Sequence, residues 1–92
     1  MDIQTQRVIF WLDAHDYSKQ HWETVAREIY DQCDGDLGKS IEELAKAIQS
    51  FHHKFQDAVV KPGNVLHEFI EMGLAKVDWI EVARTRFKQY EN

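Results

Sequence analysis

Hydrophobic residues recur at steps of three and four along most of this chain, which is the period of an amphipathic α-helix. The longest such stripe lies between Ser40 and Val59 and consists of Ile41, Leu44, Ala45, Ile48, Phe51, Phe55, Ala58 and Val59. Ser40 and Glu43 have the spacing of a capping box, so a helix is expected to begin there. Pro62 is expected to stop it. The other elements are predicted to pack around this central helix.

Two helices are predicted before the central one. The first begins with Thr5 as its N-cap and carries five consecutive apolar residues. Helix is preferred for residues 7–13, but the same run is also consistent with a short buried strand. The second helix runs from Tyr17 to Cys33, and glycines that allow left-handed backbone follow it. One of its faces carries Trp22, Val25, Ala26, Ile29 and Cys33.

Two further helices are predicted after the central one. Asn64 is placed to cap a helix whose inward face would carry Val65, Leu66, Phe69 and Ile70. Asp78 and Glu81 repeat the capping-box spacing, which predicts a last helix from Trp79 to about Tyr90. Its buried stripe would consist of Ile80, Ala83, Phe87 and Tyr90. The predicted fold class is therefore all-α, a single compact bundle of four or five helices that forms one helical domain over residues 1–92.

Length and composition agree with one soluble globular domain. The 92 residues are 43% hydrophobic and 12% aromatic, which is enough for one core. No apolar run approaches the roughly 18 residues that cross a bilayer, and the start lacks a basic segment followed by an apolar one, so we expect a cytoplasmic protein with no membrane partner. The single cysteine, Cys33, cannot form an internal disulfide, which agrees with a reducing compartment.

The residue spacings do not predict a metal site or a catalytic site. Five histidines are present, but His52 and His53 are adjacent and point about 100° apart on a helix, so they cannot bind one ion together. His67 and Glu71 share a face, and two ligands do not make a site. Phosphate-binding loops, nucleophile elbows and Cys-x-x-Cys pairs are absent from the sequence. We therefore expect no cofactor, no metal and no enzymatic activity.

The charge distribution favours a protein partner over nucleic acid. The net charge is −5, whereas nucleic-acid binders are normally basic. Six acids are expected to form an acidic surface that attracts a basic partner: Glu28, Asp31, Asp34, Asp36, Glu42 and Glu43. The alternative interpretation is that these acids form only a solvated face.

A second candidate function is a small helical DNA-binding regulator. In that case the basic last helix would contact phosphates through Arg84, Arg86 and Lys88. The acid excess over the rest of the chain argues against it.

The aromatic residues point more directly to an interface. Three Trp residues exceed what one core of this size needs, and Trp and Tyr are enriched in the buried centres of interfaces. The faces around Phe51 and Phe55 also look wide, so a monomer would struggle to cover them. We expect the partner to be another protein, either a host complex or a second copy of this chain in a homodimer. The aromatic anchor of that contact is expected among Trp11, Trp22 and Tyr30.

Two short motifs resemble those of short hypothetical proteins from phages, plasmids and other mobile elements: Trp11-Leu12-Asp13 and Val77-Asp78-Trp79-Ile80-Glu81-Val82-Ala83. Those proteins share a Trp-Leu-Asp start and a Val-Asp/Asn-Trp-x-x-Ile/Val-Ala ending. After the first motif this chain departs from them, with Ala14-His15-Asp16 where another polar residue and an acid are expected. The resemblance implies a setting in which binders that block host defence or nucleic-acid-processing complexes are common. It implies no activity.

Overall fold

The computed structural model describes residues 2–59, 63 and 65–91. These residues form five α-helices, a 3-10 helix and no strand: α1 (Ile3–Ala14), α2 (Asp16–Gln32), α3 (Leu37–Val59), α4 (Val65–Ala75), α5 (Trp79–Arg84) and η1 (Thr85–Tyr90). The all-α prediction is confirmed, and residues 7–13 are helical. The predicted stop at Pro62 and the predicted cap at Asn64 lie outside the described residues. None of the described helices is long and apolar enough to cross a membrane.

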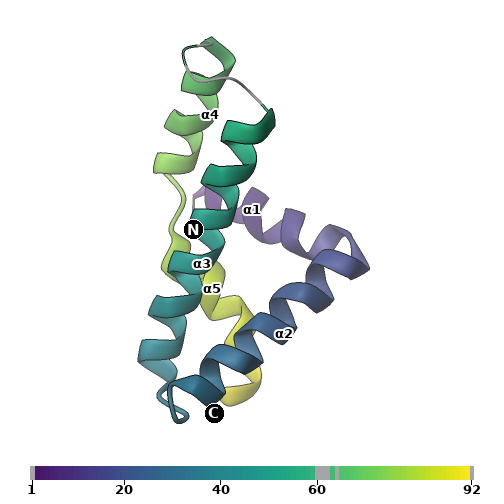
Figure 1. Cartoon of the computed structure of the whole chain (residues 1–92), viewed down its shortest axis with the longest axis vertical. Helices are drawn as coiled ribbons and strands as arrows, with labels where there is room; N and C mark the ends of the chain where they lie inside the picture. Colours follow the sequence, from purple (N-terminus) through teal and green to yellow (C-terminus); the bar gives the residue numbers. More distant parts are fainter. Residues whose placement is uncertain (1, 60–62, 64, 92) are drawn as a thin grey trace.

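The long helix α3 is the axis around which the other helices are arranged (Figure 1). α1 and α2 form a V beside it, α4 lies along its upper half and α5 along its lower half. The core therefore forms where the lower half of α3 meets α5, α1 and α2.

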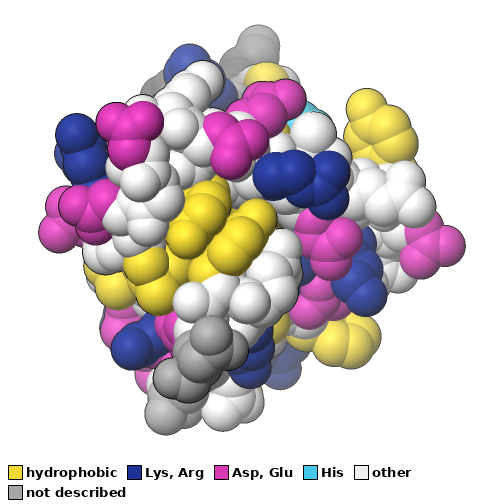
Figure 2. All heavy atoms as spheres, turned by 90° about the horizontal axis from the view of Figure 1, so that it is seen from below, with side chains coloured by type: hydrophobic (Ala, Val, Ile, Leu, Met, Phe, Trp, Pro, Cys, Tyr) yellow, Lys and Arg dark blue, Asp and Glu magenta, His cyan; other side chains and the backbone are white. Residues whose placement is uncertain are grey.

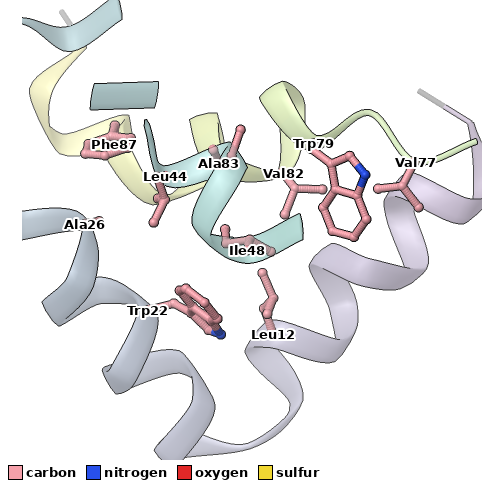
Figure 3. Close-up of a cluster of buried hydrophobic side chains, with 11 residues drawn as sticks. Leu12, Trp22, Ala26, Leu44, Ile48, Val77, Trp79, Val82, Ala83 and Phe87 are labelled. Carbon is pink, nitrogen blue, oxygen red and sulfur yellow. The ribbon is translucent and has the colours of Figure 1, made fainter. Parts of the chain in front are cut away.

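Buried side chains from four helices meet in this core (Figure 3). α3 contributes Leu44 and Ile48, which are fully buried, and α5 covers them with Val82. Leu12 of α1 and Trp22 of α2 reach the same cluster from the other side. Each such side chain contributes about 1.5 to 3 kcal/mol by leaving water. The predicted role of the central helix is confirmed for its first half.

Two polar contacts hold α1 beside the last elements of the chain. The backbone N–H of Asp78 donates to Oγ1 of Thr5 at 2.8 Å. The guanidinium of Arg86 donates to the carboxylate of Asp13 at 2.7 Å. Both pairs are separated by 73 residues in the sequence, so they join α1 near its start to the beginning of α5 and near its end to η1. The Arg86 side chain is only 4% exposed, and Asp13 supplies the charge that balances it.

Two of the predicted helix starts are wrong. Thr5 is not the N-cap of α1, because Asp2 precedes it and accepts the backbone N–H of Thr5 at 2.8 Å. The capping box at Ser40 does not form either: α3 begins at Leu37, and Asp36 accepts a first-turn N–H at 3.1 Å. Ser40 is buried in the first turn, where its hydroxyl donates to the Asp36 carbonyl at 2.6 Å. The earlier start adds the half-buried Leu37 to the core.

The predicted cap of the last helix is confirmed, but its buried stripe is only partly right. Oδ1 of Asp78 accepts the N–H three residues along at 3.1 Å, as an N-cap does. Ala83 and Phe87 are buried, whereas Ile80 is exposed. The α-helix also gives way after six residues to the 3-10 helix, in which Phe87 leaves helical geometry (φ −115°, ψ 16°). The positions of α5 that face the core are Trp79, Val82 and Ala83.

The predicted inward face of α4 is right only for Ile70, which is half-buried. Three side chains expected inside are exposed: Val65, Leu66 and Phe69. The covered face instead carries His67, which is buried, with the half-buried Ile70 and Leu74. Nε2 of Gln56 on α3 donates to the His67 carbonyl at 3.2 Å and fixes this orientation. Because α4 is apolar on both sides, its periodicity did not determine which side would be buried.

Replacing Asp13 with Asn is expected to lower the free energy of unfolding by about 2 to 3 kcal/mol, because the buried Arg86 would keep its charge without an anion beside it. The control is Glu91→Gln, which removes the exposed pair between Arg84 and Glu91 at 3.2 Å and should cost less than about 1 kcal/mol. Urea unfolding of both variants measures the difference. Equal losses would contradict a structural role for the Asp13 pair.

Candidate functional site

The apolar stripe of α3 continues beyond the core that covers its first half. Leu44 and Ile48 are fully buried, but Phe51 and Phe55 continue the same stripe and are 49% and 54% exposed. α5 packs beside the lower half only, and α4 does not cover these two rings. The part of the stripe around Phe51 and Phe55 is therefore only partly covered.

Two adjoining hollows lie over this part of α3. One has a volume of about 270 Å³ and is lined by α1, α3 and α4. The other has a volume of about 310 Å³ and is lined by α1, α2 and α3. Trp11, His52 and Phe55 line both, so the two hollows form one groove. We call it the aromatic groove, and its main apolar residues are Trp11, Tyr17, Phe51, Phe55, Ile70 and Leu74.

Ring contacts hold one wall of the aromatic groove in place. The Phe51 ring meets the indole of Trp22 edge-on, with 5.6 Å between centroids. Phe55 is stacked on Phe51 at 6.2 Å. Such geometries are favourable beyond the area they bury. Because Trp22 is anchored in the core, this wall is already formed before anything binds.

The structure separates the three predicted aromatic anchors. Trp11 is 65% exposed and lies where the two hollows join, as an anchor would. Trp22 is 5% exposed and belongs to the core, so it supports the groove and is not free to reach a partner. Tyr30 is half buried, stacked on Tyr90 with 3.9 Å between centroids, away from both hollows. Of the three, only Trp11 is both exposed and part of the lining of the two hollows.

The polar groups of the aromatic groove are basic or neutral. Among the described residues that line it, none is Asp or Glu, while Arg7, His15, His21 and His52 are present. Nδ1 of His52 donates to the Ile48 carbonyl at 2.9 Å. Burial lowers the pKa of His52, although that hydrogen bond opposes the shift. The neutral ring then offers Nε2 as an acceptor.

One buried acceptor lies beside the groove without a partner. Gln56 lines the first hollow and is almost fully buried. Its Nε2 donates to the His67 carbonyl, but its Oε1 has no hydrogen-bond partner among the described residues. A buried acceptor left unpaired costs about 1 to 3 kcal/mol. The hydrogen-bonding groups at the end of the groove next to α4 are therefore less completely paired than those of the core.

The predicted acidic surface is exposed, but basic residues interrupt it. All six acids are exposed, and they lie where the end of α2 meets the start of α3: Glu28, Asp31, Asp34, Asp36, Glu42 and Glu43. Asp36 is engaged as the cap of α3, and Glu43 lies 3.5 Å from Lys46. Figure 2, which views this end of the molecule, shows acidic and basic side chains interspersed around a hydrophobic patch. This surface therefore carries both negative and positive charges.

The three basic residues of the alternative DNA-binding function do not form a row. Arg86 is buried and paired with Asp13. Nε of Arg84 lies 3.2 Å from the carboxylate of Glu91. Of these three, only Lys88 is exposed and forms no ion pair with another described residue. The structure therefore offers little support for phosphate contacts by this helix.

Metal ligands do not gather in the described part of the chain. No three His, Cys, Asp or Glu side chains among those residues lie close enough to hold an ion. Comparisons with protein-family models, with curated proteins and with solved structures find no match. The resemblance to mobile-element proteins stays a prediction, and the aromatic groove is the strongest candidate site.

The two tryptophans of the groove should differ sharply in their effect on stability. Trp22→Ala is expected to cost about 3 to 5 kcal/mol, because it opens a cavity in the core. Trp11→Ala should cost less than about 1 kcal/mol, since most of that side chain is already in water. Chemical denaturation of the two variants tests this. Similar losses would mean that Trp11 is part of the core.

Mild acid should destabilise the fold through His52. Its pKa in the fold lies below 6.5, so the unfolded chain binds more protons once the pH falls below about 6.5, and stability decreases from there. His52→Asn keeps a donor for the Ile48 carbonyl and removes the titration. We expect the variant to lose less unfolding free energy between about pH 7.5 and about pH 5.5 than the unaltered protein. Equal losses would contradict this assignment.

Proposed function

We propose that this protein acts by binding another protein in the aromatic groove, without a catalytic step. The observation that carries the proposal is the aromatic surface left open beside a formed core. An aromatic side chain presents about 200 Å², so the exposed parts of Trp11, Tyr17, Phe51 and Phe55 together offer about 500 Å². The largest apolar patch on a typical monomer is about 300 to 600 Å² and is often functional.

The form of the groove favours a helical segment as its ligand. Its walls are helices, its lining is mostly apolar, and it runs from α2 past Trp11 to α4. An amphipathic helix binds such a groove by placing its apolar face inside. Because Arg7 lines the groove and none of its described lining residues is acidic, acidic residues beside that apolar face would add to binding.

The acidic residues between Glu28 and Glu43 keep a secondary part in this proposal. They can speed encounter with a basic partner, but the interspersed bases weaken that field. In this proposal the groove provides the affinity, and the acids provide long-range attraction. That the partner is a host defence or nucleic-acid-processing complex, which this protein would inhibit, is supported only by the resemblance to mobile-element proteins.

Trp11→Glu should strongly reduce partner capture, because Trp11 lies at the junction of the two hollows. The matched control is Phe10→Glu, which alters an equally exposed aromatic side chain on the same helix that lines neither hollow. A protein retained from a lysate by the unaltered chain should be retained by the control and reduced at least about tenfold by Trp11→Glu. Quantitative mass spectrometry of the captured material measures this. Equal retention by all three, or equal loss in both variants, would contradict the proposal.

A further inference from the structure

α4 turns a row of apolar side chains away from its own chain. Val65, Phe69 and Met72 lie four and three residues apart, which is the spacing of a seam between packed helices. All three are more than 60% exposed. The opposite face of α4, with Ile70 and Leu74, already packs toward α3 and α1. We call the outward row the α4 stripe.

The α4 stripe and the aromatic groove are complementary in charge. The described residues that line the groove include Arg7 and no acid. α4 carries Glu68 and Glu71 and no Lys or Arg. Glu68 lies one turn from both Val65 and Met72, so it borders the stripe. A helix that carries an apolar row flanked by carboxylates is the ligand that the groove favours.

We propose that a second copy of this chain supplies that helix: two copies associate reciprocally, with the α4 stripe of each in the aromatic groove of the other. The inference rests on the proposed function of the groove and names its occupant. Such a contact has two-fold symmetry, and each copy is both donor and acceptor. It covers both the aromatic groove and the α4 stripe.

The exposed apolar areas fit this reciprocal pairing better than a contact between two α4 stripes. With about 200 Å² for an aromatic side chain and about 100 Å² for an aliphatic one, the stripe with Leu66 exposes about 300 Å² and the groove about 500 Å². Together they reach the roughly 800 Å² that each partner buries in an interface of standard size. Two α4 stripes packed on each other would bury less than half of that. The reciprocal arrangement is therefore the one with sufficient area.

The first test is the mass of the protein in solution. Sedimentation of the full chain at up to about 100 μM should show a dimer, since standard-size interfaces reach micromolar affinity or better. Trp11→Glu places a charge in the groove that repels the carboxylates of α4, and Phe69→Lys places on the stripe a charge that repels Arg7. Each should weaken self-association at least about 100-fold, because each contact occurs twice. Phe10→Glu and Phe10→Lys are the matched controls and should remain dimeric.

Mixing the two variants gives the decisive result. Neither is expected to self-associate, but the mixture should form a heterodimer, because the intact groove of Phe69→Lys receives the intact stripe of Trp11→Glu. The second contact then sets the introduced Glu against the introduced Lys. Variants that pair in no mixture, while the unaltered chain dimerises, would overturn the stripe-in-groove contact. Circular dichroism checks folding, and Phe55→Glu replaces Trp11→Glu if that variant is unfolded.

Failure of this inference can be told from failure of the proposed function. A chain that stays monomeric at about 100 μM, with partner capture still lost in Trp11→Glu and kept in Phe10→Glu, overturns the second copy as occupant and leaves the groove as a site for another protein. A monomeric chain that captures its partner equally well with and without Trp11→Glu overturns both the second copy as occupant and the proposed function of the groove.

Discussion

The helix α3 is longer than the core that the rest of this chain builds around it. Its 23 residues extend about 35 Å, whereas the six residues of α5 extend only about 9 Å beside it. The radius of gyration of 13.8 Å exceeds the roughly 12 Å of a compact domain of this length, because the upper part of α3 and α4 project from the core. One continuous apolar stripe thus serves two purposes: Leu44 and Ile48 hold the fold, while Phe51 and Phe55 form a surface.

The polar contacts between distant parts of the chain keep that surface open. Thr5 with Asp78, and Asp13 with Arg86, tie both ends of α1 to α5 and η1. α1 is therefore held to α5 and η1, and it leaves Phe55 largely exposed. Trp11 projects from this fixed helix into the space between α1 and α3. The groove is consequently present in the unbound chain, which lowers the ordering cost of binding.

Much of this fold could be predicted from the sequence. Apolar periodicity located the four later α-helices, whereas the apolar run at residues 7–13 fitted either a helix or a short strand. The stripe of α3 identified Leu44 and Ile48 as core residues. The same periodicity placed Trp22 on the face it shares with Ala26, so its burial was foreseeable even though it was named as an anchor. Which face of α4 is buried was not foreseeable. That helix is apolar on both sides, so tertiary packing decides which side is covered.

The candidate site was harder to predict than the fold. A stripe that runs on to Phe51 and Phe55 indicates burial, and only the placement of α5 and α4 shows that the last part is uncovered. Arg86 looks like a surface cation in sequence, because its partner Asp13 is 73 residues away. Tyr17, which lies off the main stripe of α2, was the clearest sequence sign of an aromatic surface outside the core.

Hydrogen exchange of the full chain tests most directly whether the groove and α4 are where protein binds. The comparison is between dilute protein and protein at about 100 μM, a range that spans the affinities of standard-size interfaces. The account predicts that slower exchange at high concentration is confined to α1, the first half of α2, the second half of α3 and α4, with no change from Glu28 to Glu43. Slower exchange between Glu28 and Glu43, with α4 exchanging as fast as before, would contradict it.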